Sequence, residues 1–345
     1  MYIYYEVSRY YVTPKDSSNT AESLKNGFQK FIDEIREHGY LAKIDVEDGR
    51  YLITPFKMPP AEKPNYNRNI ILFVVTFATV FYDGYLRSTS TLLTEALMPG
   101  TSPYLNAFFF ALAILGIFGL HELGHKYATN KRGIAASMPY FLPAPPGMGG
   151  TFGAVITQKE PPVNRDALFD MGFSGPFVGF IVTIIVTIIG VKLSWLVSPN
   201  EIMQWSHLFP DVELQSIAVP RLLQYTYTLL YPQVGNYQLI LHPIAFAAWV
   251  GCLVTFLNLI PAWQLDGGHI GRALFGKKYH KSVSYASLGI MAASGFALMA
   301  IIVGFMVMRT DFSRDSLLDE ISPLSNSRRA MIAVYLLMFI LTAPI

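Results

Sequence analysis

The chain has 345 residues, of which 52% are hydrophobic and only 14% are charged. Soluble globular proteins carry about 25% charged residues, so much of this protein's surface is expected to face lipid instead of water. The formal net charge of +2 and the lack of a basic cluster argue against a nucleic-acid partner, and the single cysteine, Cys252, excludes an internal disulfide and a metal site built on cysteines.

Residues 1–65 are expected to form a small water-facing α+β domain. Strands are predicted at 2–13, 41–46 and 51–55, and the last two are joined by a turn at Glu47-Asp48-Gly49. A helix between the first two strands is predicted by apolar residues at helical spacing: Leu24, Phe28, Phe31 and Ile35. Because a βαββ unit of this size is marginal alone, we expect it to rest on the remaining chain or on a partner. A linker follows it, marked by Pro59, Pro60 and Pro64.

The remaining chain, residues 66–345, contains apolar segments long enough to cross a membrane as helices, which takes about 20 residues each. They are residues 69–86, 104–127, 170–196, 239–260, 284–308 and 330–344. The first residues carry Glu6 and Arg9 and do not fit a cleavable signal peptide, so the internal segments are expected to direct insertion. We therefore predict an α-helical polytopic membrane protein with about six transmembrane helices and an N-terminal α+β domain.

Lysine and arginine alternate between the predicted loops. They are frequent before the first span, at 128–169 and at 261–283, whereas the loops between these carry only Arg87 and Arg221. Loops rich in these residues stay in the cytoplasm, so the N-terminal domain is expected there. The loop at 309–329 breaks the alternation because it carries four arginines: Arg309, Arg314, Arg328 and Arg329.

A metal-binding pattern ends the second span. Residues 121–125 read His-Glu-Leu-Gly-His after an uncharged apolar run. Positions i and i+4 share a helix face, so His121 and His125 are expected to present two imidazoles to one ion. Glu122 lies about 100° further round, from where it can act as a base on a metal-bound water. HExxH also occurs by chance, but ionisable groups inside a membrane helix cost about 2.5–3.5 kcal/mol each, which favours a functional cluster.

A catalytic zinc site has three protein ligands and one open position. The apolar run 243–260 ends at Pro261, and Asp266-Gly267-Gly268 follows, where the glycines are expected to let the backbone turn and direct the carboxylate into the bundle. Both motifs end spans that run in the same direction, so they are expected at similar depth on the cytoplasmic side. The sequence thus predicts one zinc ion bound by His121, His125 and Asp266.

Together, His121-Glu122-Leu123-Gly124-His125 and Asn258-x-x-Pro261-x-x-x-x-Asp266-Gly267 resemble the site-2 protease family of intramembrane metalloproteases. The loop 143–154 (PAPPGMGGTFGA), Lys159-Glu160-Pro161 and residues 172–176 (GFSGP) are similar to its archaeal and chloroplast branch. The resemblance covers about residues 70–280. It implies that His121, His125 and Asp266 bind zinc, that Glu122 is the catalytic base, and that the spans at 104–127, 170–196 and 239–260 form a three-helix core. The implied substrates are transmembrane proteins in the lipid bilayer.

Several further residues are candidates for supporting roles. Asn258 is a candidate donor to the oxyanion, or else it caps or joins helices. Residues 149–158 are expected to form a strand that re-enters the membrane and pairs with an unwound substrate, with Gly153 and Val155 as contacts; the alternative is an ordinary cytoplasmic hairpin. His269 is either a neighbour of the metal ligands, a substrate contact or an interfacial histidine. Close helix approach is the role expected of three glycines, Gly172, Gly175 and Gly179.

Two other functions are compatible with parts of this pattern. A divalent metal-ion transporter would use the same histidines and aspartate as a transit site, but it needs ligands along a path and has no special use for Glu122 beside His121. A non-proteolytic membrane relative would have lost Glu122 or a ligand, and all of them are present. The protease interpretation is therefore preferred.

Overall fold

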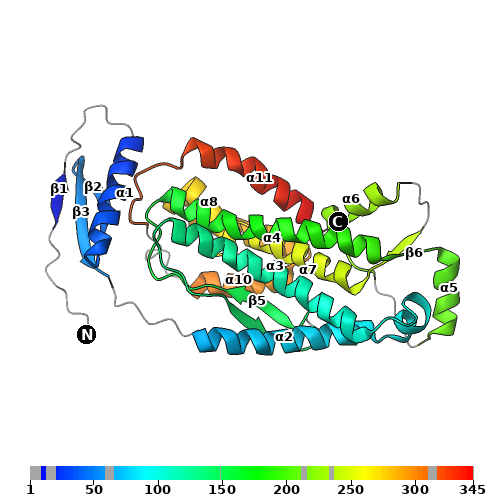
Figure 1. Cartoon of the computed structure of the whole chain (residues 1–345). Coiled ribbons are helices and arrows are strands. Elements are labelled where there is room, and N and C mark those ends of the chain that lie inside the picture. Colours follow the sequence, from blue (N-terminus) through cyan, green and yellow to red (C-terminus); the bar gives the residue numbers. More distant parts are fainter. Residues whose placement is uncertain are drawn as a thin grey trace.

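The structure is a computed structural model that describes residues 9–12, 21–58, 66–147, 149–210, 216–232, 237–309 and 317–344. The proline-rich linker and residues 2–8 and 13 of the first predicted strand lie outside these ranges. Figure 1 shows an elongated molecule with the small α+β unit at one end and a bundle of helices beside it.

The N-terminal unit contains β1 (Tyr10–Val12), α1 (Ala21–Glu37), β2 (Tyr40–Glu47) and β3 (Arg50–Lys57). The strands form one antiparallel sheet in the order β1-β3-β2, and the described elements follow one another as βαββ along the chain. Asp48 and Gly49 both have positive φ, 50° and 73°, as a tight two-residue hairpin turn requires. The helix α1 covers the sheet because its apolar stripe packs on buried strand residues, with Phe28 and Ile32 against Leu41 and Ile44.

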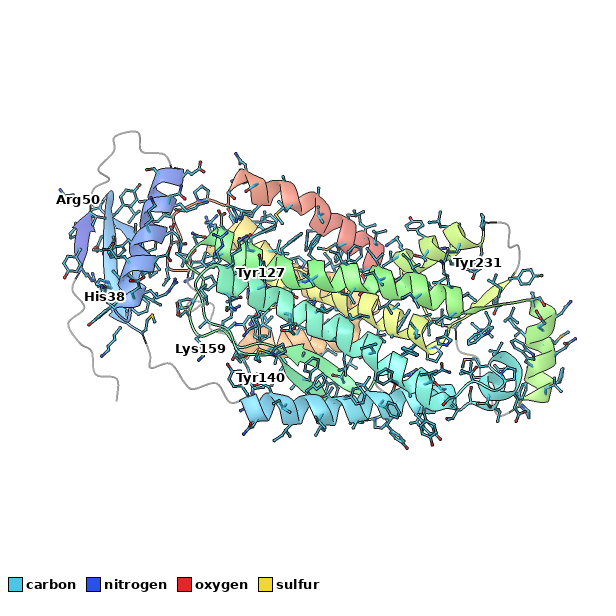
Figure 2. All side chains as sticks on the ribbon, in the orientation of Figure 1. His38, Arg50, Tyr127, Tyr140, Lys159 and Tyr231 are labelled. Atoms are coloured by element: carbon cyan, nitrogen blue, oxygen red, sulfur yellow. The ribbon has the colours of Figure 1, made fainter. Side chains whose placement is uncertain are left out.

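Within the part of the chain that the structure describes, three helices are long and apolar enough to cross a membrane: α2 (Tyr66–Ser88), α3 (Pro103–Lys131) and α4 (Arg165–Leu193). Their outward side chains, drawn in Figure 2, are large and apolar, such as Ile71 on α2, Leu112 on α3 and Ile185 on α4. Two shorter apolar helices are α7 (Pro243–Leu259) and α10 (Ala297–Arg309). The three-helix core expected from the resemblance corresponds to α3, α4 and α7, which pack on one another.

The apolar segment at 284–308 is not one helix, so the predicted count of six crossings is not confirmed. Residues 277–293 form α9 (Lys277–Ala293), Gly295 has φ 89°, and α10 follows it and packs back against α9. A left-handed glycine ends a helix because its backbone conformation cannot continue the helical hydrogen bonds. The chain after α10 then reaches the N-terminal unit, where the Ile44 amide donates to the Leu318 carbonyl at 2.8 Å.

The hairpin of α9 and α10 accounts for the position of the arginine-rich loop at 309–329, which broke the expected alternation of lysine and arginine between loops. The described part of that loop lies beside the N-terminal unit, on the same end of the bundle, before α11 (Asn326–Thr342) runs back along it (Figure 1). At the other end, β6 (Trp195–Val197) pairs with β7 (Gln238–Ile240), so α4 ends and α7 begins a few residues inside their predicted limits.

The remaining elements are short. They are η1 (Leu92–Leu97), β4 (Tyr140–Pro143), β5 (Thr151–Val155), α5 (Pro199–Leu208), α6 (Arg221–Leu230) and α8 (Asp266–Phe275). The strands β4 and β5 form an antiparallel hairpin between α2 and α3. Tyr140 starts this hairpin beside the first turns of α2, where the Arg68 guanidinium lies 4.9 Å from its ring (Figure 2).

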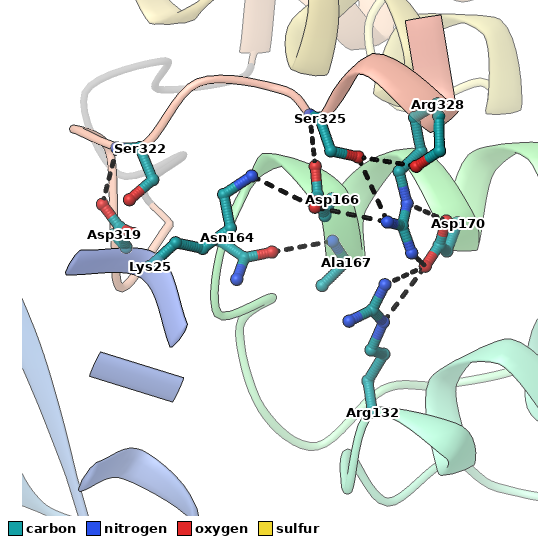
Figure 3. Close-up of polar contacts among 11 residues, drawn as sticks. Lys25, Arg132, Asn164, Asp166, Ala167, Asp170, Asp319, Ser322, Ser325 and Arg328 are labelled. Carbon is teal, nitrogen blue, oxygen red and sulfur yellow. Dashed lines mark hydrogen bonds and ion pairs between the residues drawn. The ribbon is translucent and has the colours of Figure 1, made fainter. Parts of the chain in front are cut away.

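Charged side chains fasten the N-terminal unit to the bundle (Figure 3). Lys25 of α1 lies 3.1 Å from Asp166 in the first turn of α4, and both side chains are about nine-tenths buried. The Ser325 amide, at the start of α11, also donates to Asp166. One turn further along α4, Asp170 accepts from both Arg132, which follows α3, and Arg328 of α11. Lys25 therefore joins the N-terminal unit to the start of α4, and Asp170 joins the neighbouring ends of α3, α4 and α11.

Candidate metal centre

The two histidines of the HExxH motif lie on the buried face of α3. His121 and His125 are one turn apart, and their Nε2 atoms are 3.0 Å from each other. The carbonyl of Met171 on α4 lies 2.7 Å from His125 Nδ1. A carbonyl can only accept, so Nδ1 carries the proton and Nε2 of a neutral imidazole keeps its lone pair. The α4 backbone thus leaves the Nε2 lone pair of His125 available for a metal ion.

Asp266 completes the cluster from the other side of the bundle. It is the first residue of α8, 145 positions after His121, and its Oδ2 lies 3.1 Å from His121 Nε2 while Oδ1 lies 3.2 Å from His125 Nε2. Tetrahedral zinc ligands at about 2.0–2.2 Å from the ion are separated by about 3.3 Å. Two imidazole nitrogens and a carboxylate at these separations fit one small cation, which would accept their converging lone pairs.

Glu122 lies next to this cluster, further from His121 Nε2 than Asp266 does. Its Oε1 is 3.9 Å from His121 Nε2, and one ligand atom from each of His121, Glu122 and His125 lies within 4.8 Å of the others. This position suits a base acting on a water at the metal.

Glycines on α4 allow it to approach the histidines. A Cβ at Gly175 would overlap His125 Nε2, and one at Gly179 would lie 3.0 Å from His121 Nδ1. Likewise, a Cβ at Gly172 would lie 2.6 Å from the Asp266 carbonyl. The structure confirms that α4 closely approaches its neighbours at these glycines. The space beside them is filled by the imidazoles of α3 and by the backbone of α8.

Residues 109–302, more than half of the chain, match the model of peptidase family M50. The chain belongs to peptidase family M50. This membership confirms the resemblance to site-2 proteases. No solved structure matches the chain.

Curated relatives of this M50 chain include plant proteins. It is 27% identical to probable zinc metalloprotease EGY1, chloroplastic, of Arabidopsis thaliana over 237 residues, which is 67% of this chain and 42% of the relative. It is 29% identical to probable zinc metalloprotease EGY2, chloroplastic, over 184 residues in Oryza sativa subsp. indica and 187 in Arabidopsis thaliana. Each of these EGY2 alignments covers 53% of this chain and 32% of the relative, so the chain spans less than half the length of these relatives.

In this M50 chain Gly267 and Gly268 do not form the tight turn expected from the sequence. Neither glycine has a positive φ, and both lie in the first turn of α8. A Cβ at Gly267 would overlap the Leu259 carbonyl, and one at Gly268 would overlap the Trp263 carbonyl. The left-handed residue of this loop is instead Trp263, with φ 47°. The expected glycine turn is therefore wrong: the glycines are needed because the loop lies close against α8.

The remaining candidates lie around the cluster. His269 is on α8, where its Cβ faces Gly172 of α4, and it is not one of the donors that converge. Asn258 is half-buried one residue before the end of α7. Gly153 is buried on β5 and faces Phe118 of α3, one turn before His121. The Val155 side chain is 45% exposed at the end of β5.

Sequence reasoning missed a set of polar residues on α9. His280, Ser284 and Ser287 are buried, and all three bond to the backbone of the loop before Asp266. Their spacing of four and three residues places them on one helix face, and this polar stripe in an otherwise weakly amphipathic segment is the signal that was available.

Proposed function

We propose that this protein is an intramembrane zinc metalloprotease that hydrolyses peptide bonds of transmembrane protein substrates. The observation that carries the proposal is the meeting of His121, His125 and Asp266 within about 3 Å, with Glu122 beside them, among apolar helices. Membership of a peptidase family and the metalloprotease names of the relatives support it. They give no support to a metal-ion transporter.

The residues divide into ligands, a base and a donor. His121, His125 and Asp266 would hold one zinc ion, which when bound supplies Lewis acidity to the water and to the scissile carbonyl. Glu122 takes the proton from the attacking water and delivers it to the leaving nitrogen. Asn258 donates to the oxygen on which negative charge develops. Because water is scarce in lipid, a polar opening on the cytoplasmic side would supply it.

The function is tested with purified protein in detergent and a generic transmembrane substrate. Cleavage is expected in the untreated sample, to stop after chelation, and to return when one equivalent of Zn²⁺ is added, because no group other than the ion supplies Lewis acidity. Mass spectrometry of the products would locate the cut bond within the transmembrane segment. Cleavage that survives complete removal of metal would contradict the proposal.

The strand β5 is proposed as the surface to which an unwound substrate adds. It pairs with β4 on one edge, and within the described residues no strand covers the other edge. Gly153 faces Phe118 of α3, one turn before His121, so the strand runs close to the helix that carries both histidines. Main-chain hydrogen bonds to such an edge hold an extended peptide whatever its sequence. His269 remains a candidate neighbour of the substrate on α8.

Val155→Pro is expected to raise KM by about tenfold, because proline removes a backbone donor from the strand. Val155→Ala is the matched control, since it shortens the same side chain and keeps the amide. Peptide kinetics measure both variants, and zinc content shows whether the metal centre is intact. Equal KM values for the proline variant and the wild type would remove β5 from the substrate site.

We further propose that the protein is multi-pass and that its N-terminal unit and the opening of the metal centre face the cytoplasm. The alternating lysine and arginine content of the loops supports this orientation, and so does the hairpin of α9 and α10, which returns the arginine-rich loop to the N-terminal unit. The native Cys252 is buried, so single cysteines introduced at Arg50 and Gln204 can be labelled with an impermeant reagent in intact cells. The proposed orientation predicts that the reagent labels the cysteine at position 204 and does not reach the one at position 50. The opposite labelling pattern would contradict this orientation.

A further inference from the structure

Three buried polar side chains follow one face of α9. His280, Ser284 and Ser287 are 4%, 0% and 4% exposed, whereas Ser282 on the same helix is exposed. Buried polar groups are costly in an apolar bundle unless they are hydrogen-bonded, so their partners indicate what they do.

All three partners belong to the short loop between α7 and α8. Ser284 Oγ accepts from the Trp263 amide at 2.9 Å, and His280 Nε2 donates to the Trp263 carbonyl at 3.2 Å. Ser287 Oγ donates to the Pro261 carbonyl at 3.2 Å. Both polar groups of the Trp263 backbone are therefore bonded to α9.

Trp263 is also the strained residue of this loop. Its φ of 47° lies in the left-handed region, which a bulky side chain adopts only when its surroundings hold it there. The two hydrogen bonds from α9 are on the amide and the carbonyl of this residue, so they act directly on its backbone conformation.

The loop in turn determines where Asp266 lies. The Leu265 amide donates to the Ala262 carbonyl at 3.1 Å, and the Trp263 carbonyl lies so close to Gly268 that no Cβ would fit between them. The first turn of α8, with Asp266 at its start, is thus packed directly on the Trp263 backbone. A change in that backbone would move the carboxylate away from His121 and His125.

We propose that α9 holds the third metal ligand in place, with Ser284 and His280 as positioning residues for Asp266. The inference rests on the proposed zinc site. Ser284 bonds to the Trp263 amide and acts on Asp266 through the Trp263 backbone. Outer groups that orient metal ligands commonly change metal affinity by about 10–100-fold when they are removed.

The test is the Zn²⁺ dissociation constant of the full-length protein in detergent, measured by competition with a fluorescent chelator. Ser284→Ala is expected to weaken binding by about 10–100-fold. Ser282→Ala removes the same hydroxyl from the exposed side of the same helix and is expected to bind like the wild type. Co²⁺ bound in place of zinc gives a second readout, because its visible absorption reports coordination geometry and should change in Ser284→Ala only.

A double variant checks the route through Trp263. Glycine adopts the left-handed conformation freely, so in a Trp263→Gly background the further loss caused by Ser284→Ala is expected to shrink to less than about threefold. Thermal unfolding of the metal-free proteins measures fold stability separately. A role in fold stability alone would lower the unfolding temperature of Ser284→Ala and leave its metal affinity and cobalt spectrum unchanged.

The outcomes separate this inference from the proposed function. If the wild type binds no zinc, the proposed zinc site itself is wrong and the inference falls with it. If the wild type binds zinc and Ser284→Ala binds it within about threefold of the wild type, only the positioning role is overturned. If Ser284→Ala does not fold, His280→Ala, which loses the bond to the Trp263 carbonyl, is judged by the same threshold.

Discussion

Gly175→Ala is expected to abolish zinc binding. The added methyl group would overlap the imidazole of His125, closest to Nε2, the proposed donor atom. The imidazole has little freedom to move aside because its Nδ1 is bonded to the Met171 carbonyl and because the next turn of α4 lies against His121 at Gly179. Either the ring rotates away from Asp266 or α4 moves away from α3. We expect affinity to fall by at least about 100-fold, which corresponds to about 2.7 kcal/mol.

The matched control is Gly116→Ala, on α3 itself. A Cβ at Gly116 meets no atom within 4 Å, so this substitution adds the same methyl group to a helix glycine in open space. It is expected to leave zinc affinity unchanged, and alanine favours the helical conformation more than glycine does. Isothermal titration of both metal-free proteins with Zn²⁺ makes the comparison. Wild-type affinity in Gly175→Ala would show that α4 leaves room for a methyl group between Gly175 and His125.

Glu122→Gln is expected to lower kcat by about 10³-fold or more while the protein keeps its zinc. Glutamine has nearly the same shape as glutamate but cannot accept the proton of the attacking water, and a general base commonly contributes about 10²–10⁴-fold. The three proposed ligands are unchanged in this variant, so metal content should remain at one equivalent. A loss of both activity and zinc would instead place Glu122 among the ligands.

Asn258→Ala provides a graded comparison for the same assay. An oxyanion donor commonly contributes about 10²–10³-fold in kcat. The kcat of Asn258→Ala should therefore be at least as high as that of Glu122→Gln, and its KM should change little. If Asn258 only joins helices, the unfolding temperature will fall and kcat will stay near the wild-type value. Single-turnover cleavage of a transmembrane peptide measures both variants without interference from slow product release.

Hydropathy alone predicted some of the apolar helices correctly and missed a break in another. Apolar length correctly located α2, α3 and α4 because a continuous apolar run of that length has few alternatives to a membrane helix. It did not detect the break at Gly295, because a single glycine within an apolar run hardly changes the average hydropathy. The arginine-rich loop at 309–329 was the available sign that the segment before it returns to the end of the bundle from which it started.

The sequence by itself determined the local part of the site. His121, Glu122 and His125 are separated by one and four residues, and helix geometry places them together whatever else the chain does. The sequence also indicated Asp266 as the third ligand, and the structure brings it to the two histidines from 145 residues away. Tertiary structure alone decided that Gly175 leaves room for a ring on another helix and that Ser284 bonds to a loop that it does not adjoin in sequence. These contacts depend on how helices pack across the bundle, and no periodicity within one segment records that packing.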